Sequence, residues 1–194
     1  MMNREMAIKN QIEDSIKLKK YLVTRIDVLM SIADELVRGF QRGNKVLLFG
    51  NGGSAADAQH IVAELAGGFY LDREPLPAIA LTTNTSSLTA IANDYGYDSV
   101  FVRQLRGLVK KGDIAIGLST SGDSPNVLLA MEEAKRRGAV TIAFTGKGGK
   151  LKELVDYALP IPSEASARIQ EAHITAGHIV CYLVEEELFG KHSE

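Results

Sequence analysis

One short turn in this 194-residue sequence has the composition of a phosphate-binding loop. Gly50-Asn51-Gly52-Gly53-Ser54 follows the apolar run 45–49 and opens a helical stretch. Glycines at such a point let the backbone N–H groups of a helix start approach an anion without a side chain in the way. The alternative is a tight turn between a strand and a helix that binds nothing.

A second turn, Ser119-Thr120-Ser121-Gly122-Asp123-Ser124, follows the apolar run 114–118 and carries four hydroxyl groups. Hydroxyls and backbone N–H groups can bind phosphate oxygens, and the dipole of a following helix adds about 0.3–1 kcal/mol. We expect Ser124 to be the N-cap of that helix and Pro125 its first residue. Hydroxyl turns and helix capping are the alternative explanation. Two such turns, each after an apolar strand, favour a phosphate site.

His60 and Glu64 lie in the helical stretch behind the first turn. Four residues make about one helical turn, so both side chains share one face. An imidazole and a carboxylate in this arrangement can share a divalent metal, or act as a base and its partner. The alternative is a surface pair that contributes about 0.2–0.5 kcal/mol.

Three polar residues, Gln170, His173 and His178, stand among apolar residues in the last helical stretch, 167–188. Gln170 and His178 are separated by about 12 Å along a helix. Their long side chains could only just converge on one point, so we expect a site here to draw on more than one chain. We expect His173 to pack within the helix layer and His192 to lie in a frayed tail.

A dinucleotide site is the main rival to the phosphate site. Gly50, Gly52 and Ala55 fit the fingerprint G-x-G-x-x-A. That fingerprint requires an acidic residue at the end of the second strand to hold a ribose, and the second predicted strand ends in Leu81-Thr82-Thr83-Asn84. The sequence therefore disfavours dinucleotide binding.

Apolar runs that alternate with helical stretches must position these residues. Such alternation predicts a doubly wound α/β fold, with a parallel sheet covered by helices on both faces. Ligands of these sheets bind outside the carboxyl ends of the strands, where both turns fall. Ile8, Ile12 and Ile16 recur at helical spacing and predict an amphipathic first helix. The predicted strands are 45–49, 78–82, 114–118, 140–144 and 157–161, and the predicted helices are two within 4–41, one that ends near 66, 86–110 with a turn at 93–97, 126–137, and 167–188.

The composition excludes several classes of protein. The 22 Lys and Arg residues against 24 Asp and Glu residues give a formal charge of −2, which argues against a general nucleic-acid binder. The single cysteine, Cys181, excludes an internal disulfide, and its apolar neighbours predict a buried, inert thiol. No apolar run reaches the length of about 18 residues that a membrane span needs, and the first 20 residues contain no signal-like apolar core. We expect a soluble, cytoplasmic protein of one domain, residues 1–194.

The whole set of motifs resembles the SIS (sugar isomerase) family, and within it the sedoheptulose 7-phosphate isomerases, over nearly the full chain. The motifs that carry the resemblance are Gly50-Asn51-Gly52-Gly53-Ser54, Ala58-Gln59-His60, Glu64, Asn93-Asp94, Ser119-Thr120-Ser121-Gly122, Ser124, Arg168-Ile169-Gln170-Glu171-Ala172-His173 and His178.

The resemblance implies an SIS-type fold and an isomerase that converts sedoheptulose 7-phosphate to D-glycero-D-manno-heptose 7-phosphate, for lipopolysaccharide or capsule heptose. It implies a cytoplasmic homotetramer with active sites at subunit contacts, and a helical segment, 1–41, that packs on its own domain or on a neighbouring subunit. It assigns catalysis to Glu64 and His178, and one zinc ion per subunit to His60, Glu64, Gln170 and His178. The implied substrate-binding residues are Asn51, Gly52, Gly53, Ser54, Glu64, Asn93, Asp94, Ser119, Thr120, Ser121, Ser124 and Gln170.

One departure concerns the end of the helix that carries Glu64. Many relatives have an arginine where this chain has Gly68, in the run Gly67-Gly68-Phe69, so a charge near the substrate mouth is missing. A non-catalytic relative that binds sugar phosphates or a replication initiator is the alternative function, and an isomerase for another phosphosugar is a nearer one. The carboxylate at Glu64 favours an enzyme.

Overall fold

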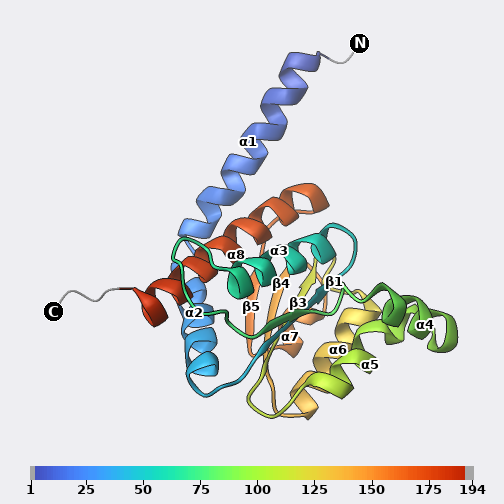
Figure 1. The fold of residues 1–194 in the computed structure, drawn as a ribbon. Coiled ribbons are helices and arrows are strands. Elements are labelled where there is room, and N and C mark those ends of the chain that lie inside the picture. The colour runs from blue at the N-terminus through green and yellow to red at the C-terminus, as the bar shows by residue number, and fades with distance from the viewer. Residues whose placement is uncertain (1–2, 191–194) are drawn as a thin grey trace.

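The structure, a computed structural model, describes residues 3–190, so His192 lies outside the described residues. The predicted parallel sheet is confirmed: within the described range five strands pair in the order β2-β1-β3-β4-β5 (Figure 1). β2 is shorter than predicted, because the chain turns after Ala80, whose carbonyl accepts the hydroxyl of Thr83. The strands are β1 Val46–Gly50, β2 Ala78–Ala80, β3 Ile114–Ser119, β4 Val140–Thr145 and β5 Tyr157–Pro160.

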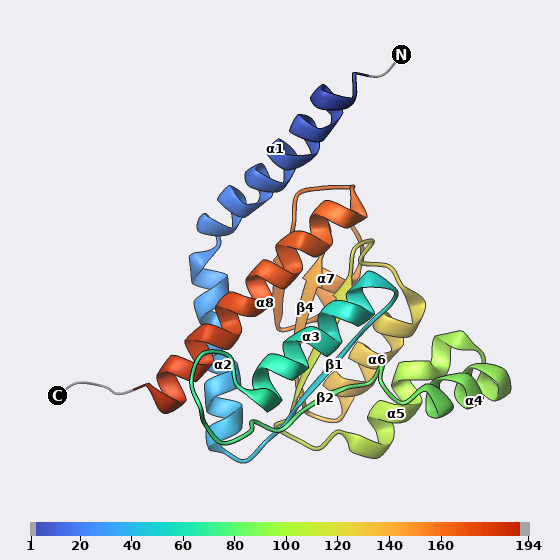
Figure 2. The ribbon, with the colours of Figure 1, turned by 45° about the horizontal axis from the view of Figure 1, so that its top comes forward.

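Helices cover both faces of the sheet. Every residue of β1 and β3 is buried, as expected of central strands with helices on both sides. Figure 2 shows α3 and α8 side by side across one face. That face carries α2 Ile26–Gln41, α3 Gly53–Gly67 and α8 Ser166–Phe189, and the other carries α5 Val100–Leu108, α6 Pro125–Arg136 and the short α7 Leu151–Leu154.

Helix α4, Thr85–Tyr95, corrects one detail of the prediction. Asn93 and Asp94 were expected in a turn, but they lie in the last turn of this helix, which continues until Gly96 takes a φ of +82°. A short 3-10 segment, η1 Tyr97–Ser99, then leads into α5. The single predicted helix with an interruption is therefore two helices, and the break lies later than the sequence suggested.

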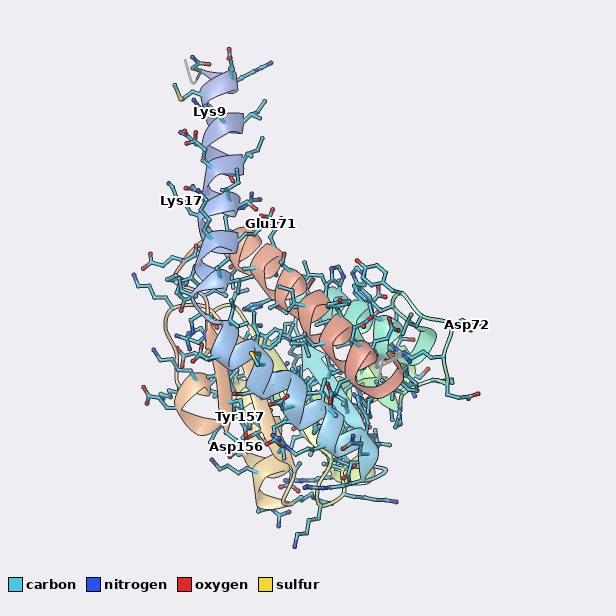
Figure 3. All side chains as sticks on the ribbon, turned by 90° about the vertical axis from the view of Figure 1, so that its left-hand side faces the viewer. Lys9, Lys17, Asp72, Asp156, Tyr157 and Glu171 are labelled. Atoms are coloured by element: carbon cyan, nitrogen blue, oxygen red, sulfur yellow. The ribbon has the colours of Figure 1, made fainter. Side chains whose placement is uncertain are left out.

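Helix α1, Arg4–Val23, stands clear of the rest of the subunit for much of its length (Figures 1 and 3). Its predicted apolar stripe is solvent-exposed within the subunit, since Ile8, Ile12 and Ile16 are 63%, 55% and 46% exposed. The buried residues of this helix, Leu18 and Leu22, lie near its C-terminal end, where it contacts α8.

The strand order places the two predicted turns next to each other. β1 and β3 are neighbours with Gly50 opposite Leu118, so the turns at 50–54 and 119–124 leave the sheet side by side. The sheet grows in opposite directions from this pair, and such a switch point is where open α/β sheets bind their ligands. Among the residues that the structure describes, no helix is both long and apolar enough to cross a membrane.

Candidate active site

The first turn meets the C-terminal helix at the point where α3 begins. Gly52 has a φ of +56°, which favours glycine. A Cβ atom on Gly53 would lie 2.6 Å from the side-chain amide of Gln170 of α8, so a larger residue here would displace that amide. Ser54 is buried in the first turn of α3. The structure thus brings Gln170 against the first predicted turn.

Asn51 is held by a pair of hydrogen bonds between two side-chain amides. Asn51 Nδ2 donates to Asn126 Oδ1, and Asn126 Nδ2 donates back to Asn51 Oδ1, both at 2.9 Å. The hydroxyl of Tyr97 also donates to Asn51 Oδ1, at 3.1 Å. Sequence reasoning missed Asn126 and Tyr97; only the position of Asn126 beside the second turn could have drawn attention to it.

The hydroxyls of the second turn gather around Ser119. The Oγ of Ser119 lies 3.0 Å from that of Ser124 and 3.4 Å from that of Ser121, and it accepts the N–H of Gly122 at 3.1 Å. Ser124 and Pro125 occupy the predicted N-cap and first position of α6. The Ser124 hydroxyl faces Ser119 rather than capping the helix, and no other described side chain caps it. Pro125 has no N–H, and the N–H groups of Val127 and Leu128 donate to the carbonyl of Ser124. Among the described residues at this helix start, the N–H of Asn126 is therefore the one left for an anion.

A hollow of about 300 Å³ opens beside these hydroxyls, at the carboxyl ends of β3 and β4. Thr120 Oγ1 lies 3.3 Å from Ser166 Oγ at the first residue of α8, so a second helix start borders the hollow. Lys147 contributes an ammonium group, which lies 2.6 Å from Glu164. Hydroxyls, a cation and helix starts are groups that suit a phosphate. The lining residues are Thr120, Ser121, Lys147, Gly148, Ser163, Glu164 and Ser166.

His60 and Glu64 of α3 meet His178 of α8, as the family resemblance implied. His60 Nε2 lies 3.1 Å from Glu64 Oε1 and 3.3 Å from His178 Nε2. The close approach of the two helices depends on Gly177, where a Cβ atom would lie 2.6 Å from the side chain of Ile61. The triad is half open to solvent, and the Glu64 side chain is 22% exposed.

The three side chains have the spacing of a metal site. One ligand atom from each of His60, Glu64 and His178 lies within 4.8 Å of the others. Zinc bonds of 2.0–2.2 Å in tetrahedral geometry separate neighbouring ligand atoms by about 3.3 Å, close to two of the distances in this triad. Imidazole and carboxylate are also common zinc ligands. Gln170, which packs on Gly53, remains only a predicted fourth ligand.

Asp57, one turn before His60 on α3, is a titratable group that the sequence analysis passed over. Its Oδ2 atom is shielded from solvent and has no hydrogen-bond partner within residues 3–190. Burial raises the pKa of Asp57 from 3.8 to about 6, although the charge of His60 opposes the shift. A shielded carboxylate oxygen without a hydrogen bond lowers the stability of the folded protein.

Asn93 and Asp94 are not joined to the rest of the predicted site. Asn93 Nδ2 donates to Asp94 Oδ1 at 2.8 Å, and both residues are exposed at the end of α4. No hydrogen bond within the described subunit links either residue to the two turns or to the triad. Their assignment to substrate binding remains a prediction.

Two further residues have the structural roles that were expected of them. His173 is buried and donates from Nε2 to the carbonyl of Thr145 at 3.1 Å. Burial lowers the pKa of His173 to about 4, which the hydrogen bond only partly offsets, so the ring is neutral. Cys181 is buried as well, and burial raises the pKa of its thiol to about 12, as befits an inert thiol.

An aromatic hollow of about 420 Å³ lies beside the triad, on the outer side of α8. The ring of Phe69 packs on that of His178, with 5.6 Å between centroids. Gly68, which stands where many relatives have an arginine, has a φ of +116°. A Cβ atom there would lie 3.0 Å from the carbonyl of Leu71. The loop in this chain is therefore shaped around glycine. The lining residues are Phe69, Tyr70, His178, Ile179 and Tyr182.

Comparison with known proteins gives a consistent result. The sequence model of the SIS domain matches residues 12–146. The chain is 49% identical to phosphoheptose isomerase 2 of Campylobacter jejuni, over 98% of this chain and 97% of the relative. It is 52% identical to phosphoheptose isomerase of Clostridium acetobutylicum, over 95% of this chain and 96% of the relative.

Solved structures agree with the sequence relatives. The fold matches a phosphoheptose isomerase from Neisseria gonorrhoeae with a TM-score of 0.89 at 39% identity, over 95% of this chain and all of the other. It matches a phosphoheptose isomerase from Francisella tularensis with a TM-score of 0.91 at 36% identity, over the same shares of the two chains.

Proposed function

The chain belongs to the SIS domain family, and we propose that it isomerises sedoheptulose 7-phosphate to D-glycero-D-manno-heptose 7-phosphate. One observation carries the proposal: His60, Glu64 and His178 converge in a chain about half of whose residues match those of named phosphoheptose isomerases. A sugar-phosphate isomerase needs an anion site and a proton-transfer group at one sheet edge. The two turns and the triad together supply both.

The phosphate binds at the second turn. Ser119, Ser121 and Ser124 direct hydroxyls toward one another there, and the backbone N–H of Asn126 at the start of α6 adds a further donor. Thr120 borders the neighbouring hollow. The sugar then extends past the first turn, where Asn51 and Gln170 can hold its hydroxyls, toward the triad. We also keep Gly52, Gly53, Ser54, Asn93 and Asp94 as proposed substrate-binding residues.

Glu64 and His178, the proton-transfer pair, carry the chemistry. Isomerisation removes a proton from C1 of the ketose while the oxygen on C2 gains one, which gives an enediol. C2 then gains a proton while the hydroxyl on C1 loses its proton and becomes the aldehyde carbonyl. Glu64 takes and returns the carbon proton, using Oε2, because Oε1 lies against His60. His178 moves the proton at oxygen. A positioned acid or base contributes about 10²–10⁴ in rate.

His60, Glu64, Gln170 and His178 would hold one zinc ion per subunit. When bound, the ion would polarise the sugar carbonyl and orient the two oxygens of the reacting carbons. The residue types and the spacing of the triad support this assignment.

The active enzyme is a cytoplasmic homo-oligomer, a tetramer with its active sites at subunit contacts. Ile8, Ile12 and Ile16 form an exposed stripe along α1, which a second subunit can cover. The half-open triad and the aromatic hollow beside it suit the same arrangement. The product supplies heptose for lipopolysaccharide or capsule glycans.

The test is incubation with sedoheptulose 7-phosphate in D₂O, followed by NMR of the products. We expect an aldose heptose phosphate that carries deuterium at C2, because Glu64 exchanges its proton with solvent. Thermal stabilisation by the sugar phosphate without any conversion would contradict the enzyme and favour a sugar-phosphate-binding protein.

A further inference from the structure

We propose that three residues outside the predicted site, Phe69, Arg73 and Glu185, are positioning residues for the proton-transfer pair. The inference rests on the proposed function, since it assigns to these residues a part in that reaction. They link the loop that follows α3, residues 68–73, to the C-terminal half of α8.

Glu185 of α8 is the centre of the arrangement. It is fully buried, and its carboxylate accepts three consecutive backbone N–H groups from the loop, those of Phe69 at 2.9 Å, Tyr70 at 2.6 Å and Leu71 at 3.1 Å. Burial alone would raise the pKa of Glu185, but these N–H groups and Arg73 outweigh it and lower the pKa. The carboxylate is therefore ionised and fixes the path of the loop.

Arg73 links Glu185 to the backbone of Glu64, the proposed base. Its Nε donates to Glu185 Oε1 at 2.8 Å, and the two side chains are 2% and 1% exposed. Its Nη2 donates to the carbonyl of Glu64 and its Nη1 to the carbonyl of Leu65, each at 2.9 Å. The last turn of α3, and with it the backbone of Glu64, is thus tied to α8.

Phe69 links the same carboxylate to His178, the second residue of the proton-transfer pair. Its backbone N–H is bound by Glu185, and its ring packs on the ring of His178, with 5.6 Å between centroids and 37° between planes. One buried carboxylate on α8 therefore fixes the backbone of Glu64 through Arg73 and the ring of His178 through Phe69.

Packing alone does not explain this choice of residues. A buried ion pair is a poor source of stability, because apolar residues of similar volume often serve as well or better. A carboxylate that accepts four hydrogen bonds does, however, fix both the position and the orientation of the groups that donate to it. Proton transfer depends on such placement, and a displacement of about 1 Å can reduce the rate about 100-fold.

The decisive variant is Phe69→Leu, which removes the ring from His178 but keeps an apolar side chain and the backbone N–H. We expect kcat to fall about tenfold or more at a temperature far below unfolding, while KM changes less than about threefold. With substrate deuterated at C1, the isotope effect on kcat should rise, because C–H cleavage becomes slower than the other steps. Phe69→Tyr, which keeps the ring, should restore the rate.

Glu185→Gln is the second variant, and we expect it to lower kcat as well as thermal stability. The matched control is Asp72→Asn, which removes a carboxylate from the same loop; Asp72 is exposed and lies at the outer edge of the molecule (Figure 3). This control should retain the wild-type kcat. If Glu185→Gln does not fold, the comparison of Phe69→Leu with Phe69→Tyr tests the positioning role.

A folded Phe69→Leu variant with wild-type kcat and an unchanged isotope effect would overturn the positioning role. An unaltered rate in folded Glu185→Gln would do the same. Failure of the proposed function is distinguishable, because the wild-type protein itself would then convert no sedoheptulose 7-phosphate.

Discussion

Helices α3 and α8, with the loop that follows α3, carry two groups of polar side chains that differ in how many of their hydrogen bonds are made. At one point Glu185 and Arg73 are buried, and each makes several hydrogen bonds of good length. At the other, His60, Glu64 and His178 are half open and share two contacts of 3.1 and 3.3 Å. The polar atoms of the first group are engaged in hydrogen bonds within the subunit, whereas those of the second group can still bind a ligand. Satisfied groups hold the helices together, and the incompletely satisfied ones are free for chemistry.

Substitution of Glu64 should produce the largest effect and separate the two groups most clearly. Glu64→Gln keeps the shape but cannot accept the carbon proton, so we expect kcat to fall by about 10²–10⁴ or more. The side chain is partly exposed, so the unfolding free energy should change by less than about 0.5 kcal/mol. Steady-state kinetics and thermal denaturation measure the two quantities. Retained turnover would remove Glu64 from the role of base.

Removal of metal comes next in expected size. A Lewis acid at a carbonyl contributes several kcal/mol, so chelation should lower turnover about 100-fold, and added zinc should restore it. The Glu185 group contains no expected ligand, so circular dichroism should report an unchanged fold. Full activity in exhaustively stripped protein, with metal content measured, would eliminate the proposed zinc site.

Glu185→Gln, which we expect to lower kcat, should also destabilise the protein. Leaving Arg73 without its buried partner typically costs about 3–5 kcal/mol. The pKa of Glu185 is lowered below 4.5, so its contribution is present above that pH and is lost as the pH falls through the folded-state pKa. The stability difference between wild type and variant should therefore shrink below about pH 4.5. Equilibrium denaturation across this range measures it, and a difference independent of pH would contradict the role of the charge.

Asp57→Asn should have the smallest effect, and it should stabilise the protein rather than destabilise it. The folded-state pKa of Asp57, about 6, exceeds its ordinary 3.8, so ionisation opposes folding as the pH rises between these values. Because the group is only half-buried, we expect a gain of about 1 kcal/mol at pH 7, or about 2–4 °C in Tm. The gain should vanish below pH 4. A variant that is less stable at pH 7 would show that Asp57 has a partner in the assembled protein.

Much of the fold was predictable because its strands are continuous apolar runs. The sheet, the helix layers, and the positions of Ser124 and Pro125 follow from such local signals. The break after α4 was misplaced because Asn93 and Asp94 favour turns but tolerate a helix end. Sequence periodicity predicted the amphipathic character of α1, but could not show that its stripe remains exposed within one subunit.

The candidate site was predictable only where its residues are close in sequence or match a known motif. His60 and Glu64 share a helix face by spacing alone, whereas their meeting with His178 depends on the close helix crossing at Gly177. Asn126, Arg73 and Glu185 were missed because their partners are far along the chain, and a single Glu in a helix gives no local sign of such partners.

The central claim is that the substrate phosphate binds at 119–124 while the reacting carbons lie beside Glu64. A crystal structure of the inactive Glu64→Gln variant with sedoheptulose 7-phosphate tests it most directly. We predict that the phosphate contacts the hydroxyls of the second turn and that C1 and C2 lie within about 3.5 Å of the side chain at position 64. A bound sugar whose C1 and C2 lie far from that side chain would contradict the account.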